Sequence, residues 1–164
     1  RLVHLQMSSP ILAEAYEAIL HVTQDVLRVH QAAIYRTNEG GGELELKMGL
    51  GLSKPDLLEH ESELGDHGPI PLDDEESIVA LTFHDGKPRA GEGREAAVPI
   101  LYDEKAVGVL WVDSLEEGEL DREAELETLW RLGLEAALCI RSAQVTEDLD
   151  EGEIDVAELL NLGE

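Results

Sequence analysis

Apolar residues recur at helical spacing in two long stretches, one near each end of the chain. The first covers residues 10–29, where Ser9 is suited to cap a helix and Pro10 fits its first turn. The second begins at Asp121 and runs to about residue 145. Each apolar stripe spans roughly 200° of its helix, about twice the width that packing on one sheet requires. The pattern predicts two amphipathic helices with apolar surface to spare.

Between these helices the pattern changes to that of strands and turns. Residues 32–50 predict a hairpin with its turn at 38–42, followed by a strand that alternates strictly. This alternation places four apolar side chains on one face: Leu44, Leu46, Met48 and Leu50. Residues 96–114 are nearly all apolar and predict two central strands covered on both faces, joined at 103–105. A short helix is predicted over 75–86, closed by Gly86.

This order of elements predicts an α+β domain, in which flanking N- and C-terminal helices pack on a central antiparallel β-sheet. We expect residues 1–8 to be an N-terminal extension, 9–146 the domain itself and 147–164 an acidic tail. The stretch 51–71 is irregular and predicts a loop with at most one short helix. Since the chain begins with Arg1, we expect it to be part of a longer protein.

Charge limits the classes of partner. The chain has 12 Lys+Arg against 37 Asp+Glu, a formal net charge of −25. Nucleic acids and anionic membrane surfaces are bound through basic faces, so neither is expected as a partner. No apolar run approaches the ~18 residues of a membrane span and no signal peptide is visible, which favours a cytoplasmic location. Cys139 is the single cysteine, which excludes an internal disulfide and a thiolate zinc site.

Several titratable side chains are candidates for binding, but none forms a catalytic motif. His60 and His67 stand among carboxylates, which can hold a divalent cation or form a solvated acidic loop. We assign no metal. Arg89 and Arg94 bracket a glycine-rich loop, where they can clamp an anion or pair with neighbouring acids. Residues 148–158 are one residue short of an EF-hand loop, so calcium binding by the tail stays open. Without a Ser-His-Asp, Cys-His or paired-carboxylate arrangement, we expect no enzyme.

Two segments, AAVPILYDEKAVGVLWVDS and ELETLWRLGLEAALCIRSAQ, carry a resemblance to a known family. They resemble the Val-Pro strand, the Gly-Val-Leu-aromatic-Val-Asp-Ser strand and the final small-residue helix of GAF sensor domains from bacterial signalling proteins. Upstream, EESIVALTFHDGKPR and AAIYRTNEGGGELEL resemble the short helix and first hairpin of that family. The resemblance covers about residues 9–145 and consists of packing motifs.

The resemblance implies a regulatory domain that binds a small molecule, dimerises, or does both to control an attached output module. Members of the family that bind or convert particular ligands have characteristic residues, and this chain lacks them. It has no pocket cysteine for bilin attachment or methionine sulfoxide reduction, and it lacks the residue set that binds cyclic nucleotides. No cofactor is therefore identifiable, and the ligand is unknown. The residues of this chain expected to bind it are His67, Ile78, His84, Arg89, Arg94 and Trp111.

The surplus apolar surface of the two long helices predicts a homodimer in which they form a four-helix bundle. The residues expected at this interface are Ile19, Val26, Leu126, Leu129, Gly133 and Ile140. The alternative is a domain whose pocket is filled by its own side chains. Such a domain would serve only as a structural dimerisation or interaction module.

Overall fold

Seven strands form one antiparallel sheet in the computed structural model, which describes residues 2–4, 10–38, 40–52, 68–91, 95–113 and 122–150. Their bounds are β1 Leu2–His4, β2 Gln31–Thr37, β3 Glu43–Leu50, β4 Ile70–Pro71, β5 Arg89–Ala90, β6 Ala96–Tyr102 and β7 Lys105–Asp113. The strands lie in the order β1-β3-β2-β7-β6-β5, and β4 pairs with the start of β3. Both predicted hairpins are present, as β2–β3 and β6–β7.

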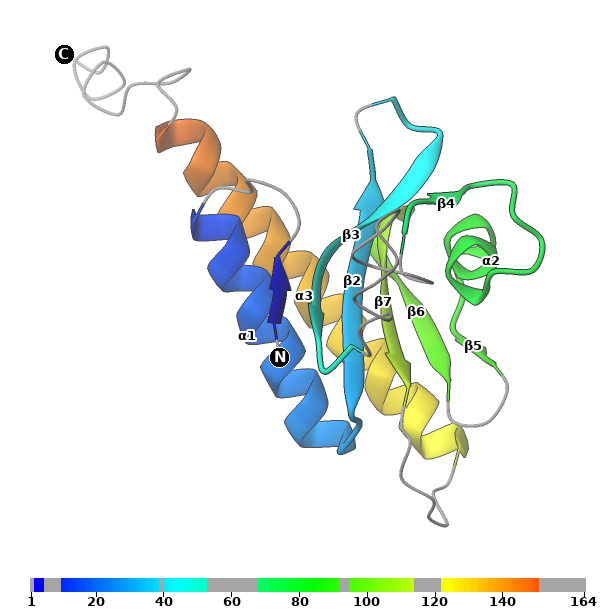
Figure 1. The fold of residues 1–164 in the computed structure, drawn as a ribbon. Coiled ribbons are helices and arrows are strands. Elements are labelled where there is room, and N and C mark those ends of the chain that lie inside the picture. Colours follow the sequence, from blue (N-terminus) through cyan, green and yellow to red (C-terminus); the bar gives the residue numbers. More distant parts are fainter. Residues whose placement is uncertain are drawn as a thin grey trace, which may run out of the picture.

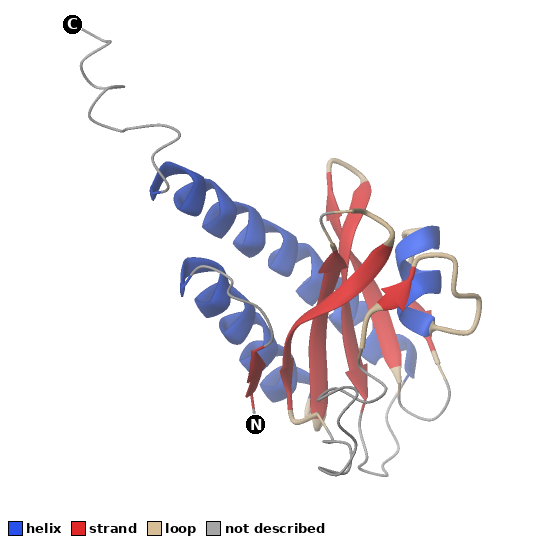
Figure 2. Ribbon diagram, turned by 45° about the horizontal axis from the view of Figure 1, so that its top comes forward, coloured by secondary structure: helices blue, strands red, loops and turns tan. Residues whose placement is uncertain are grey.

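Helices cover both faces of this sheet (Figure 1). They are α1 Pro10–Leu27, α2 Ile78–Asp85 and α3 Arg122–Asp150. On one face, here called the helix face, α1 packs on β2 and β3, α3 packs on β6, and the two antiparallel helices pack on each other. The opposite face, the α2 face, carries α2 against β6 and β7 (Figure 2). The predicted α+β class with flanking terminal helices is confirmed.

Each face of the sheet has its own apolar core. Side chains of β2, β3, β6 and β7 alternate between the two, as the period of two residues in a strand requires. The core of the helix face is the larger and includes Leu20, Ile34, Leu110 and Leu129. Among the described residues, no helix combines the length and the hydropathy of a membrane span.

The alternation along β3 reverses within the strand. The pairing with β2 skips Lys47, which is an extra residue of the kind that forms a β-bulge. As a result, Leu44 and Leu46 point to the α2 face. Met48 and Leu50 point to the helix face. The prediction that all four share one face is therefore wrong, because a single inserted residue inverts every side chain beyond it.

α2 ends at the predicted Gly86, but it begins at Ile78, three residues after the predicted start at Glu75. The Ser77 hydroxyl accepts a hydrogen bond from the Ala80 N–H at 3.3 Å, which caps the first turn. Gly86 follows the last turn in the left-handed conformation, with φ of 66°, and its N–H donates to the Thr82 carbonyl at 3.0 Å. The two caps hold this short helix over the sheet.

Gly133 allows α3 to lie close to β6. A Cβ at this position would be 2.9 Å from Cγ2 of Val98 and 3.3 Å from the Pro99 carbonyl oxygen. The absence of a side chain thus serves the packing of α3 on the sheet. This corrects the expected place of Gly133, which lies against the chain's own sheet and presents no surface to a second copy.

Candidate functional site

Polar side chains from neighbouring strands meet on the α2 face. Trp111 on β7 donates its indole N–H to Oε2 of Glu95, with an N···O distance of 3.0 Å. Glu95 directly precedes β6. Tyr35 lies on β2, and it is almost completely buried, as is Trp111. The neighbours of Trp111 across the strands are Ala33 and Ala97, whose small side chains leave room for the indole ring.

Tyr35 has an altered acidity for two reasons. Burial raises the pKa of its hydroxyl above the usual value near 10, because the phenolate would lose its hydration. The negative charge of Glu95 raises this pKa further. The hydroxyl therefore stays protonated and can donate a hydrogen bond far into the alkaline range.

This acidity predicts a loss of stability at high pH. The unfolded chain releases the Tyr35 proton near pH 10 and the folded chain holds it, so the free energy of unfolding falls as pH rises above about 10. The slope due to this residue approaches about 1.4 kcal/mol per pH unit. Urea unfolding of the natural protein and Tyr35→Phe between about pH 9 and 11 measures it. Parallel pH dependences of the two proteins would contradict the assignment, since all other groups are shared.

α2 closes this face with apolar side chains and one hydroxyl. Ile78, Val79 and Phe83 pack on the core that includes Trp111. Thr82 is fully buried, and its Oγ1 has no hydrogen-bond partner within the described part of the chain. An unpaired buried hydroxyl costs about 1–3 kcal/mol. Thr82 is thus a position on the buried side of α2 where a polar group could gain a hydrogen bond.

The structure brings two of the predicted ligand-binding residues, Ile78 and Trp111, into the core of the α2 face. His67 and Arg94 lie outside the described residues, as does the pair of histidines considered for a metal. Most of the calcium-loop candidate at 148–158 also lies outside them. In the ranges that the structure covers, no group of three or more His, Cys, Asp or Glu side chains could hold a metal ion.

The two remaining candidates, His84 and Arg89, are directed to the surface. The His84 side chain is 78 % exposed, with its Nδ1 3.6 Å from Oδ1 of Asp85. Arg89 forms an ion pair with the same Asp85 carboxylate. Ion pairs at this level of exposure contribute about 0–1 kcal/mol. Neither residue joins the polar group around Trp111, which corrects their expected place in a ligand site.

Glu95 and Tyr35 are residues of this face that the sequence analysis did not select. Trp111 offers the signal that could have found Glu95, because a buried indole N–H needs an acceptor. Glu95 stands two residues before Ala97, and two residues is the spacing that returns a strand side chain to the same face.

On the helix face, most residues predicted at a dimer interface lie in the chain's own core. Ile19, Leu129 and Ile140 are buried, and Leu126 is partly buried against the same cluster. Val26 is exposed. The reason is that α1 and α3 pack on each other as well as on the sheet, which covers the apolar surface that seemed surplus. Of the predicted interface residues, Val26 is therefore the one whose side chain stays accessible to a second copy.

Three apolar side chains of α3 face solvent: Leu134, Leu138 and Val145 are 44 %, 69 % and 53 % exposed. At ~100° per residue, their spacing of four and seven places them on one line along the helix. The same geometry puts this line, here called the outer α3 stripe, opposite the side that carries Leu129 and Ile140. The stripe is accessible to a second molecule.

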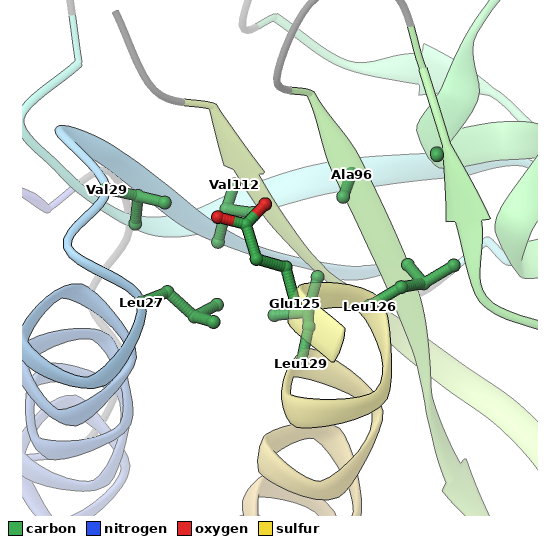
Figure 3. Close-up of a pocket in the computed structure, with 8 residues that line it drawn as sticks. Leu27, Val29, Ala96, Val112, Glu125, Leu126 and Leu129 are labelled. Atoms are coloured by element: carbon green, nitrogen blue, oxygen red, sulfur yellow. The ribbon is translucent and has the colours of Figure 1, made fainter. Parts of the chain in front are cut away.

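A notch opens on the helix face where the end of α1 and the start of α3 meet the sheet (Figure 3). The notch is open to solvent on one side and forms a shallow recess, not an enclosed cavity. Its lining residues are Leu27, Val29, Ala90, Ala96, Val112, Glu125, Leu126 and Leu129. Two of them, Leu126 and Leu129, were predicted at a dimer interface and instead form a wall of this notch.

Solved structures with the same arrangement include GAF domains and a reductase. The GAF-B domain of DevS from Mycobacterium smegmatis aligns over 84 % of this chain and 98 % of its own, with a TM-score of 0.66 and 16 % identity. The GAF domain of a phosphoenolpyruvate-protein phosphotransferase from Coxiella burnetii aligns over 87 % and 89 %, with a TM-score of 0.62 and 17 % identity. A type II free methionine-R-sulfoxide reductase from Thermoplasma acidophilum aligns over 80 % and 96 %, with a TM-score of 0.58 and 15 % identity.

These likenesses establish the class of fold. No protein-family model and no curated protein sequence matches the chain. The chain has the GAF fold, and the resemblance seen in its sequence is confirmed at that level. Because the fold occurs both in signalling proteins and in an enzyme, the role of this chain must be argued from its own residues.

Proposed function

We propose that this chain is the regulatory sensor domain of a bacterial signalling protein, which dimerises through its terminal helices and controls an attached output module. The observation that carries the proposal is the outer α3 stripe, with its three exposed apolar side chains in line. α3 is also the longest helix described, at 29 residues, and its last turns extend past the start of α1 (Figure 2). A helix in this position can transmit a change in its packing to a following module.

The expected strength of the dimer follows from the stripe and from the charge. Each stripe side chain is already about half covered, so burying it contributes roughly 1–1.5 kcal/mol. The six side chains of a dimer contribute roughly 6–9 kcal/mol. This is similar to the cost of association. Since each chain carries a charge of −25, we expect a weak dimer that salt strengthens by screening repulsion.

The sensing part of the proposal concerns a small molecule held between α2 and the sheet. Glu95, Tyr35 and the unpaired Thr82 hydroxyl supply polar groups there within an apolar setting, which is typical of ligand sites. Cys139, the single cysteine, packs against the core of the helix face, on the other side of the sheet. This placement supports a binding role for the α2 face without thiol catalysis.

The second candidate is a dimerisation module that binds no ligand. It is favoured by Trp111 and Tyr35, whose buried side chains fill the centre of the α2 face. Native mass spectrometry of gently purified protein separates the two candidates. A retained small molecule that is lost in Thr82→Val supports sensing, and an unmodified mass for the natural protein supports the ligand-free module.

Light scattering after size exclusion tests the dimer, at roughly 0.1 mM protein and in low and high salt. We expect a mass between monomer and dimer that rises with salt, and a monomer for Leu138→Glu under both conditions. Lys87→Gln is the matched control, since it makes the same change of net charge at an exposed position. A natural protein that is monomeric throughout would contradict the proposal, as would dimers of Leu138→Glu.

A further inference from the structure

The outer α3 stripe is part of a seven-residue pattern along the helix. Its three side chains and Arg141 follow one another at spacings of four, three and four residues. This is the alternation of a and d positions that lets two helices pair as a coiled coil. The same spacing continues to Arg131 before the stripe and to Asp148 after it. The stripe is therefore the apolar centre of a longer seam, with a cation before it and an anion after it.

The charged side chains of this seam are accessible. Arg131 donates to Oε1 of Glu127 at 3.0 Å, and the two side chains are 74 % and 66 % exposed. Asp148 is exposed near the end of α3. The guanidinium carbon of Arg141 lies 4.6 Å from the centre of the Tyr102 ring, so this charge is engaged at the end of β6. Arg131 and Asp148 thus flank the stripe with opposite charges that a second helix would meet.

A parallel pair of α3 helices would bring like charges together. By symmetry each residue of the seam would face its own copy, so Arg131 would meet Arg131 and Asp148 would meet Asp148. The sequence at 151–164, which follows α3, contains five acidic and no basic residues, and both copies of it would start at the same end of the pair. Like charges in these positions destabilise an association. The charge pattern therefore disfavours the parallel arrangement.

An antiparallel pair brings opposite charges together. In this orientation the a positions of one helix face the d positions of the other. The register in which Leu134 faces Val145 of a second copy also places Arg131 opposite Asp148 of that copy, and symmetry repeats both contacts. A shift by one heptad would instead place Arg131 opposite Arg141. One antiparallel register therefore combines the apolar contacts with two ion pairs.

We propose that the outer α3 stripe binds the same stripe of a second copy in antiparallel orientation, in the register that pairs Arg131 with Asp148. This inference rests on the function proposed above, since it specifies how that dimer is built. In this register the C-terminal ends of the two α3 helices lie about 30 Å apart along their common axis. Modules that follow α3 are then held apart, so this dimer opposes any output step that needs contact between them.

Disulfide formation under mild oxidation tests the orientation. In the proposed register, position 134 lies about 16 Å along the axis from its own copy, and so does position 145. Disulfides need Cα atoms within about 7 Å, so neither Leu134→Cys nor Val145→Cys should form one alone. A mixture of the two variants should form the mixed disulfide. The natural protein is the blank, because its single cysteine, Cys139, packs against the core of the helix face.

A charge reversal tests the register. Asp148→Arg makes the net charge less negative, which by itself favours association, but it places two arginines opposite each other in the proposed dimer. We expect it to raise the dimer Kd by at least about fivefold in sedimentation equilibrium at about 0.1 M salt. Asp25→Arg makes the same change of net charge at an exposed position of α1 and should leave Kd unchanged or lower. Combining Asp148→Arg with Arg131→Asp restores opposite charges and should return Kd to within about twofold of the natural value.

The outcomes separate this inference from the proposed function. A natural protein that forms dimers, with disulfides in each single-cysteine variant and none in the mixture, has parallel helices, which overturns the inference and leaves the dimer in place. Tighter association of Asp148→Arg, equal to that of Asp25→Arg, overturns the register. A natural protein that is monomeric in light scattering overturns the inference together with the proposed dimer.

Discussion

Replacing Gly51 with alanine is expected to destabilise the domain by about 3–5 kcal/mol, a large part of the roughly 5–15 kcal/mol that usually stabilises a domain. Gly51 follows β3 with φ of 71°, a left-handed conformation that costs a residue with a Cβ about 1–2 kcal/mol. In addition, a Cβ at this position would overlap the carbonyl oxygen of His30. That oxygen belongs to the backbone and accepts a hydrogen bond from Nε2 of Gln24 at 3.3 Å, so it cannot move aside cheaply.

Gly41 provides a matched control for this prediction. Its φ of 73° is almost the same, and nothing lies within 4 Å of the position that a Cβ would take. Gly41→Ala therefore carries the conformational cost alone, about 1–2 kcal/mol. Urea unfolding measures the free energy of unfolding of both variants. The difference between their losses of stability is the contribution of the overlap with His30. Equal losses of stability in the two variants would show that the turn after β3 relaxes freely.

The presence and order of the helices and hairpins could be predicted from the sequence because their signals are local. Ser77 and Gly86 mark the ends of α2 through hydrogen bonds within a few residues of each helix end. The β-bulge at Lys47 has no such signal, because it exists only in the pairing of β3 with β2. The alternation therefore predicted correctly that Leu44 shares a face with Leu46 and that Met48 shares a face with Leu50. It placed both pairs on the same face, and the bulge puts them on opposite faces.

The interface residues could not be predicted for a different reason. An apolar arc on a helix shows that surface must be covered, but not by which partner. α1 and α3 cover much of each other's arc, which places Ile19 and Ile140 inside the chain. The residues left exposed, such as Leu134, are those on the side of α3 away from both the sheet and α1. That division depends on the tertiary packing of two segments that are about 100 residues apart.

The candidate ligand site was partly predictable. Ile78 and Trp111 were selected and lie on the α2 face, since strand and helix periodicity fix the face of such residues. Arg89 was selected for its charge, and its partner is the nearby Asp85 of α2. Charged side chains at a surface have several partners within reach, so sequence spacing does not decide between them. Buried polar groups such as the Trp111 N–H have few acceptors available, and their partners are easier to infer.

A glutamate at position 140 is expected to unfold the domain, whereas a glutamate at position 138 is expected to leave it folded. Ile140 is 4 % exposed within the core of the helix face. Ile140→Glu removes its apolar contacts and buries a charge, a combined loss of about 4 kcal/mol or more. Leu138 is 69 % exposed, and leucine and glutamate have similar helix propensities, so Leu138→Glu should change the free energy of unfolding by about 0.5 kcal/mol or less.

Circular dichroism and urea unfolding of the two variants, each combined with light scattering, distinguish a core residue from an interface residue. A core role for Ile140 requires loss of the cooperative transition in Ile140→Glu. If Ile140→Glu unfolds like the natural protein and is a monomer, then Ile140 faces a second chain, and the packing of α3 on the sheet differs from the one described. Leu138→Glu then serves as the reference, because it adds the same negative charge two residues away, on the opposite side of the helix.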